Sequence, residues 1–186
     1  IRQVTERTVD FGATDGPMSD KQLFKVDGKL LHIPTVLGAD VPVFNLKGVT
    51  DLTFSGETLA HIFLGKIKRW NDPAIKKENP DAKLPDSGIT VVHRADGSGT
   101  SYIWTDYLSK VSKEWETKVG RNTAVSWPIG LGGKGNEGVA GLVKQTPNSI
   151  GYVELIYATQ NDMTYAAVIN AAGKAVKADL DSVKAA

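Results

Sequence analysis

The chain has 186 residues, 41% hydrophobic and 23% charged, a composition that indicates one medium-sized domain or two small lobes and excludes a disordered chain. Lysine and arginine number 22 against 21 aspartate and glutamate residues, so a net charge of +1 offers no general attraction to nucleic acid. The lack of cysteine excludes disulfides, thiolate zinc sites and cysteine nucleophiles. No apolar run approaches the roughly 20 residues that a membrane-spanning helix needs.

The first quarter of the chain predicts little regular structure. It starts at Ile1 without an initiator methionine, so we expect a mature or trimmed product. A short strand is expected over 8–12, where apolar residues alternate, and a helix is expected to begin at Ser19. Extended segments broken by proline are expected at 31–34 and 41–44.

The rest of the chain alternates between helical and strand patterns. Helices are expected over 56–64, 73–78, 98–111 and 138–144, and strands over 89–94, near 124–127, over 150–155 and near 165–169. Only 174–186 is polar enough to suggest a frayed end. Alternating strands and helices predict an α/β domain with a largely parallel sheet.

The run from Arg94 to Thr100 places a strand end, a glycine turn and a helix start in direct succession. The first N–H groups of a helix lack intrahelical partners and lie at the positive end of its dipole, which suits them to an anion. Ser98 and Thr100 add hydroxyls, Gly99 allows close approach, and Arg94 adds planar N–H donors. The run therefore predicts an anion site, although ordinary turn and capping chemistry would use the same residue types.

Two aspartates accompany this pattern, Asp96 within the turn and Asp15 in a second glycine-bounded turn. A carboxylate normally repels an anion, but it can accept a hydrogen bond from an anion that keeps a proton. Phosphate keeps one at neutral pH and sulfate does not, so an aspartate could accept phosphate and reject sulfate. The alternative is that both aspartates cap turns or pair with Arg94.

Enzyme interpretations rest on weaker motifs. Residues 130–135 satisfy the G-x-G-x-x-G pattern of dinucleotide-binding domains, and Glu154 follows about 20 residues later, but Trp127-Pro128 interrupts the preceding strand. A serine hydrolase using Ser98 and His93 would need glycine at residue 96, which is aspartate. The three histidines lack metal-ligand spacing, so neither a metal nor a cofactor is expected.

Five collinear segments closely resemble the periplasmic phosphate-binding protein family. They are Thr8–Asp15, Leu64–Asp72, Arg94–Thr100, Trp127–Asn136 and Ile150–Glu154. The resemblance implies a periplasmic-binding-protein-like (type II) α/β fold in which two lobes close on phosphate. Family members are longer at both ends, so residues 1–44 are expected to be a remnant of the first lobe and 45–186 the second lobe.

The resemblance also implies roles. Asp15 is expected to accept the phosphate proton, and Arg94 to donate to phosphate while partly held by the supporting Asp96. Ser98, Gly99 and Thr100 are expected to donate from the helix start. The implied function is that of a solute-binding protein, not an enzyme: a monomeric, periplasmic or extracytoplasmic receptor that delivers inorganic phosphate to the membrane permease of an ABC transporter. A different oxyanion remains an alternative ligand.

Overall fold

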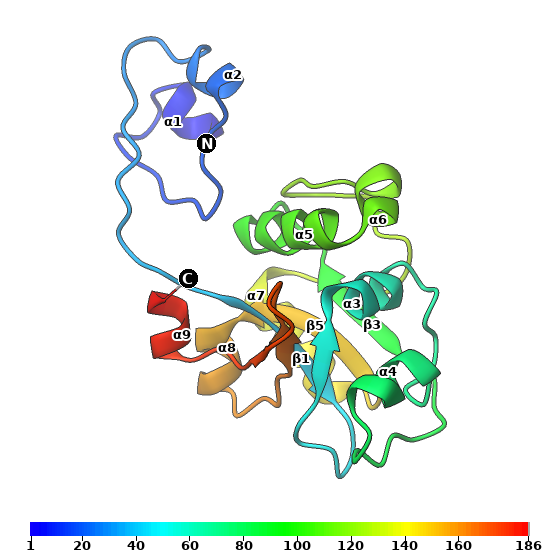
Figure 1. The fold of residues 1–186 in the computed structure, drawn as a ribbon. Helices are drawn as coiled ribbons and strands as arrows, with labels where there is room; N and C mark the ends of the chain where they lie inside the picture. The colour runs from blue at the N-terminus through cyan, green and yellow to red at the C-terminus, as the bar shows by residue number, and fades with distance from the viewer. Residues whose placement is uncertain (186) are drawn as a thin grey trace. The chain divides into compact units, whose positions relative to one another are not determined.

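The computed structural model describes residues 1–185 and divides into two compact units, Ile1–Leu37 and Gly38–Ala186 (Figure 1). The division falls before β1 (Asp40–Asn45), which belongs to the sheet of the larger unit. The assignment of 1–44 and 45–186 to two lobes stays a prediction.

The smaller unit contains two short helices, α1 (Arg2–Thr5) and α2 (Asp20–Leu23). As expected, Ser19 caps α2, in a capping box with Gln22. The strand expected over 8–12 was wrong: these residues form no strand, and the Phe11 side chain is 87% exposed. An alternating pattern makes a strand only when a second strand supplies hydrogen-bond partners, and the smaller unit has none among its described residues.

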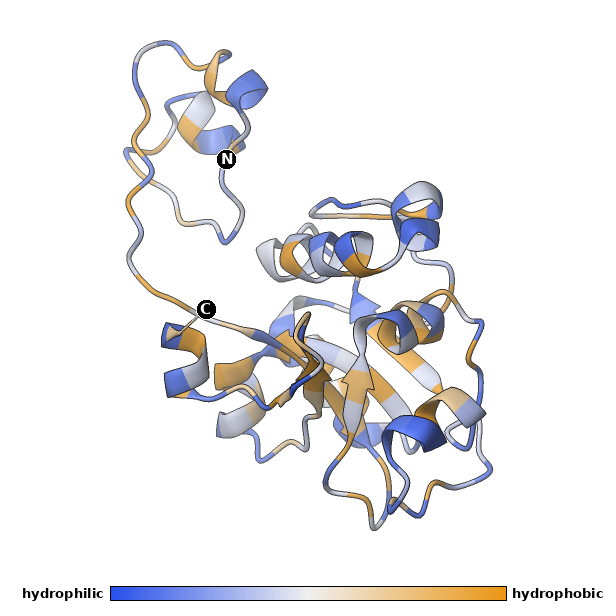
Figure 2. Cartoon of the chain, viewed as in Figure 1, coloured by the Kyte–Doolittle hydropathy of each residue, from blue (hydrophilic) through white to orange (hydrophobic). Residues whose placement is uncertain are grey.

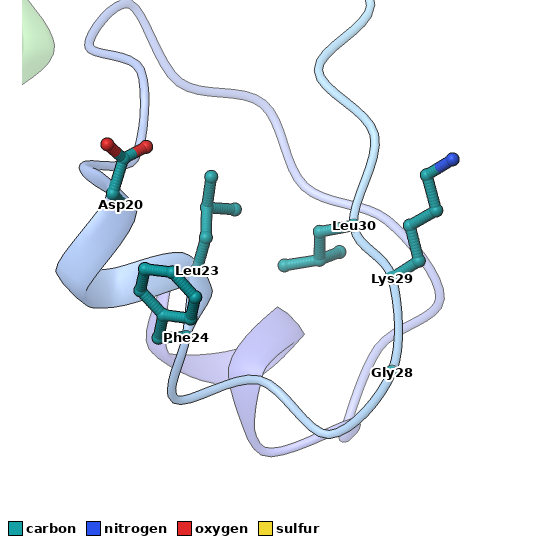
Figure 3. Close-up of a pocket in the computed structure, with 6 residues that line it drawn as sticks. All are labelled: Asp20, Leu23, Phe24, Gly28, Lys29 and Leu30. Atoms are coloured by element: carbon teal, nitrogen blue, oxygen red, sulfur yellow. The ribbon is translucent and has the colours of Figure 1, made fainter.

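Figure 3 shows a shallow hollow within the smaller unit, where Leu30 points toward Leu23 and Phe24. Asp20, Gly28 and Lys29 complete its lining. The hollow is mostly apolar, and Lys29, the one cation among its lining residues, points away from it in Figure 3, so it is not an anion site of the kind that the sequence predicts.

The larger unit is built on a four-stranded sheet in the order β1-β5-β3-β4. The remaining strands of this sheet are β3 (Thr90–Arg94), β4 (Leu131–Gly133) and β5 (Ser149–Glu154). β3 runs parallel to both β4 and β5, whereas β1 is antiparallel to β5. A second sheet joins β2 (Thr53–Ser55) to β6 (Ala167–Ile169) in parallel and β6 to β7 (Ala175–Val176) in antiparallel orientation. The sheets are therefore mixed, each with one antiparallel edge strand.

Seven helices surround these sheets in the described part of the larger unit. They are α3 (Gly56–Phe63), α4 (Pro73–Glu78), α5 (Gly99–Val111), α6 (Lys113–Lys118), α7 (Gly135–Gln145), α8 (Leu155–Gln160) and α9 (Leu180–Lys184). The expected helices are confirmed near their predicted bounds, and Gly65, with a φ of 72°, follows α3 where the sequence predicts its end. None of the described helices is long and apolar enough to cross a membrane.

The strand expected near 124–127 was wrong. These residues run irregularly, and the Trp127 ring stacks on His93 with centroids 4.8 Å apart. The sheet position beside β3 is taken instead by Leu131–Gly133, which follows Pro128 and lacks β-branched residues. The glycine-rich strand β4 was not predicted from the sequence, because glycine has a low strand propensity.

Two apolar clusters pack on the two faces of the main sheet, whose strands are coloured largely as hydrophobic in Figure 2. Alternation along β5 sends Ile150 and Tyr152 into one cluster and Val153 into the other. The first cluster is rich in aromatic rings, including the fully buried Trp70 and Trp115. A packed sheet of this kind fixes the carboxyl ends of β3 and β5, where the candidate site lies.

Candidate functional site

The turn from β3 to α5 has the strand–turn–helix form that the sequence predicts. β3 ends at Arg94 and α5 begins at Gly99 after the cap residue Ser98, whose hydroxyl accepts a hydrogen bond from Ser101 N at 3.2 Å. The Gly99 and Thr100 amides meet no acceptor among residues 1–185. These donors lie at the positive end of a 13-residue helix, the arrangement that binds an anion.

Arg94 lies against Asp96 at the start of this turn. Its Nε donates to Asp96 Oδ1 at 2.8 Å and its Nη2 to Oδ2 at 2.6 Å, while the Arg94 side chain is only 9% exposed. The hydrogen bond from Arg94 holds the pKa of Asp96 well below its usual range, and the same bond raises the pKa of Arg94. The other guanidinium N–H groups have no partner among the described residues, so the arginine can still donate to a ligand.

Tyr152 supports the turn from β5. Its hydroxyl accepts a hydrogen bond from Arg94 N at 3.2 Å and lies 2.7 Å from Ser101 Oγ. Burial raises the pKa of Tyr152 to about 12, so the phenol stays neutral. The Tyr152 ring also stacks on Trp104 of α5, with centroids 5.1 Å apart. These contacts fix the first turn of α5 against the end of β3.

Glu154 and Asn136 are site residues that the sequence did not assign to an anion site. The Thr100 hydroxyl donates to Glu154 Oε1 at 3.2 Å, and Asn136 Nδ2 donates to the same oxygen at 2.9 Å. The sequence held one usable signal, the strand expected over 150–155 in a largely parallel sheet: β5 is parallel to β3 in the structure, so Glu154 ends at the same sheet edge as Arg94. Asn136 gives no comparable signal, because its position depends on where α7 begins.

The glycine run at 130–135 does not form a dinucleotide-binding loop. Gly130 precedes β4 and Gly133 ends it, whereas the fingerprint requires the first glycine to follow a strand. A Cβ atom on Gly133 would come within 2.6 Å of the Gly138 carbonyl carbon in α7. Gly133 therefore allows β4 to pack closely against α7. The glycine run does not lie in the strand–turn–helix context that a dinucleotide-binding loop requires.

The other enzyme interpretation also lacks a geometric basis. The Ser98 hydroxyl caps α5, and no hydrogen bond joins it to His93 among residues 1–185. His93 instead lies against Trp127, where burial lowers its pKa. The part of the chain that the structure describes holds no group of three or more histidine, cysteine, aspartate or glutamate residues suited to a metal ion.

Asp15 lies in the smaller unit, at an exposed bend. The bend is held by Thr14, whose hydroxyl donates to Gly16 O at 2.9 Å. The structure brings Arg94, Asp96, Ser98, Gly99 and Thr100 together in the larger unit, whereas Asp15 belongs to the smaller unit. The expectation that Asp15 accepts a ligand proton stays a prediction.

The larger unit thus has the features of an α/β oxyanion-binding domain: a helix start, an oriented arginine and buried hydroxyls at the carboxyl edge of a sheet. A family model described as "PBP superfamily domain" matches residues 1–186, and the chain belongs to this superfamily. The periplasmic-binding-protein-like α/β fold expected from the sequence is therefore confirmed.

Two curated relatives are about 50% identical to the chain in sequence. It is 53% identical over 187 residues to the phosphate-binding protein PstS of Pasteurella multocida, covering 100% of this chain and 54% of that protein. It is 51% identical over 188 residues to the phosphate-binding protein PstS of Xylella fastidiosa (strain Temecula1), covering 100% and 51%. The chain spans about half the length of these relatives.

Solved structures share the fold. A substrate-binding protein from Clostridium perfringens, solved with bound phosphate, matches 99% of this chain and 63% of its own with a TM-score of 0.71 and 20% identity. A phosphate-binding protein from Stenotrophomonas maltophilia matches 83% of this chain and 48% of its own with a TM-score of 0.59 and 22% identity. At these identities the match concerns the fold alone.

Proposed function

We propose that this chain binds inorganic phosphate as the receptor of a phosphate ABC transporter. The observation that carries the proposal is the turn from Arg94 to Thr100, which holds an oriented guanidinium and two helix amides without an acceptor among residues 1–185. Two relatives about half identical to the chain are named phosphate-binding proteins. A helix N-terminus and an arginine together provide the dense N–H donors that a dehydrated oxyanion requires.

In this proposal Arg94, the Ser98 hydroxyl and the Gly99 and Thr100 amides donate to phosphate oxygens, and Asp96 orients Arg94. Asp15 accepts the proton that phosphate keeps and sulfate lacks. The proposed ligand set thus combines donors with one acceptor, which is the combination that favours a protonated anion.

The wider biological role follows from the same proposal. The protein would act outside the cytoplasm, in the periplasm or an equivalent compartment, as a monomer without enzymatic activity. It would pass phosphate to the membrane permease of the transporter. Residues 1–44 would belong to the first of two lobes and 45–186 to the second, so that ligand donors come from both.

Isothermal titration of the intact protein with phosphate at neutral pH, with sulfate as the control ligand, tests the proposal. We expect saturable heat from phosphate and none from sulfate at the same concentrations. Equal binding of both anions would favour a general oxyanion binder, and the absence of heat from both would overturn the proposed function.

A further inference from the structure

Two helix starts meet on one carboxylate in the larger unit. The Thr100 hydroxyl, in the first turn of α5, and Asn136 Nδ2, in the first turn of α7, both donate to Glu154 Oε1. The contact to Asn136 is reciprocal, since Glu154 N donates to Asn136 Oδ1 at 3.4 Å. Glu154 therefore connects the end of β5 to the beginnings of two helices.

Asp96, just after β3, connects that strand to the start of α7 in a similar way. Its Oδ1 atom accepts from Gly135 N at 3.1 Å as well as from Arg94. Consecutive residues at the start of α7, Gly135 and Asn136, are thus hydrogen-bonded to the carboxylates of Asp96, just after β3, and of Glu154, at the end of β5. The start of α7 braces the turn from which Arg94 and α5 offer their donors.

We propose that Glu154 is a positioning residue for phosphate, acting through Thr100 and Asn136 without contacting the anion. The proposal rests on the proposed phosphate-binding function. By holding the Thr100 side chain, Glu154 fixes the first turn of α5, which carries the Gly99 and Thr100 amides. Preorganised donors bind an anion more tightly because their ordering is complete before the ligand arrives.

Burial explains why the contact matters. Thr100 is 1% and Asn136 7% exposed, so water cannot readily replace the carboxylate as their hydrogen-bond partner. A buried donor that loses its acceptor is costly and moves to find another. Removing the Glu154 side chain would therefore displace the first turns of α5 and α7 from their positions.

The negative charge of Glu154 separates this proposal from the simplest alternative, because the two predict opposite changes in phosphate affinity when the carboxylate is removed. A carboxylate that merely lies near an anion site repels the anion, so its removal should strengthen phosphate binding. A positioning carboxylate behaves differently: Glu154→Ala should weaken binding even though a negative charge is lost. Glu154→Gln keeps an acceptor oxygen for Thr100 and Asn136 and should preserve the affinity.

The test is titration of phosphate into the intact parent protein, Glu154→Ala and Glu154→Gln, with thermal unfolding of each ligand-free protein. We expect Glu154→Ala to bind roughly tenfold more weakly and Glu154→Gln to stay within about threefold of the parent. An Ala variant that binds as tightly as the parent, or more tightly, would overturn the proposal. A parent that binds no phosphate would instead overturn the proposed function.

Glu78 provides a matched structural control. Its carboxylate accepts from Ser55 N at 3.1 Å and from the Thr58 hydroxyl at 2.8 Å, and so holds the start of α3 as Glu154 holds that of α5. Glu78→Ala should lower thermal stability without changing the phosphate affinity. An equal loss of affinity in both Ala variants would mean that general destabilisation explains the result, and would overturn the positioning role.

Asn136→Ala is the second variant, for the case in which Glu154→Ala does not fold. It removes one of the two donors that share Glu154 Oε1 and leaves the carboxylate in place. Severalfold weaker phosphate binding is expected, since the start of α7 is released from β5. Unchanged binding by Asn136→Ala would count against the proposal.

Discussion

The Arg94 guanidinium and the Asp96 carboxylate form a two-point pair, with Nε to Oδ1 at 2.8 Å and Nη2 to Oδ2 at 2.6 Å. The residues are two apart in sequence, so the turn after β3 folds back on its own strand end. The pair neutralises most of the local charge and fixes the plane of the guanidinium. Attraction for an anion at this turn consequently depends on the α5 amides as well as on arginine.

Asp96→Asn should make the stability of the ligand-free protein less dependent on acid pH. The hydrogen bond from Arg94 lowers the folded-state pKa of Asp96 below the ordinary value of 3.8. The resulting stability is present above pH 3.8 and is lost as the pH falls through the lower folded-state pKa. Urea unfolding between pH 2 and 7 should show a shallower acid decline for Asp96→Asn than for the parent.

Asp86→Asn is the control for this measurement. Asp86 also accepts from an arginine, Arg69 Nε at 2.6 Å, but the two side chains are 69% and 55% exposed. Exposed pairs contribute little because water screens them. If Asp86→Asn changed the acid dependence of stability as much as Asp96→Asn, the Arg94–Asp96 pair would stabilise the protein no more than an exposed pair does.

Arg94→Lys should weaken phosphate binding by roughly tenfold or more, although it keeps the positive charge. Lysine lacks the planar donors that pair with Asp96 and would leave that carboxylate partly unsatisfied. Phosphate titration at two salt concentrations measures the effect. Arg69→Lys, at an exposed arginine, should bind like the parent; an undiminished affinity in Arg94→Lys would remove Arg94 from the site.

Asp15→Asn should relax discrimination against sulfate. The amide can donate a hydrogen bond to a fully deprotonated oxyanion, which a carboxylate cannot do. We expect the ratio of sulfate to phosphate affinity to rise by roughly tenfold, measured by competition titration of the intact protein. Asp10→Asn, at another exposed aspartate of the smaller unit, should leave the ratio unchanged. Unaltered selectivity in Asp15→Asn would contradict a ligand role for Asp15.

The β3–α5 turn was well predicted from the sequence, because residue types that lie next to each other favour its strand end, its turn and its helix cap in succession. The β-branched residues before Arg94 favour a strand, the Asp-Gly-Ser-Gly run favours a turn, and Ser98 favours a helix cap. The orientation of Arg94 by Asp96 also follows from their closeness in sequence. For these features, local preference and tertiary structure agree.

Features that depend on distant pairing were not predictable in the same way. The 8–12 pattern resembles a strand but finds no partner strand among the described residues of the smaller unit, and β4 is a strand because β3 offers an edge to glycine-rich residues. Likewise, the meeting of Thr100, Asn136 and Glu154 depends on the order β5-β3-β4. Sequence spacing alone does not contain that order.

The contact between β4 and α7 predicts that alanine substitutions at two glycines change the free energy of unfolding in opposite directions. Gly133→Ala would place a Cβ atom 2.6 Å from the Gly138 carbonyl carbon and 2.7 Å from Val139 N, both backbone atoms that cannot turn aside. Gly141, in the same helix, has no described atom within 4 Å of its Cβ position apart from the neighbouring backbone of α7 itself. Its replacement by alanine meets no obstacle and favours the helix.

We therefore expect Gly133→Ala to lower the free energy of unfolding by about 1–3 kcal/mol through overpacking, and Gly141→Ala to raise it by about 0.5–1 kcal/mol. Urea unfolding measures both changes. Because α7 carries Asn136, its displacement in Gly133→Ala should also weaken phosphate binding, whereas Gly141→Ala should bind like the parent. Equal stability of the two variants would mean that β4 and α7 can separate freely, and the bracing of the anion turn by α7 would then have no structural basis.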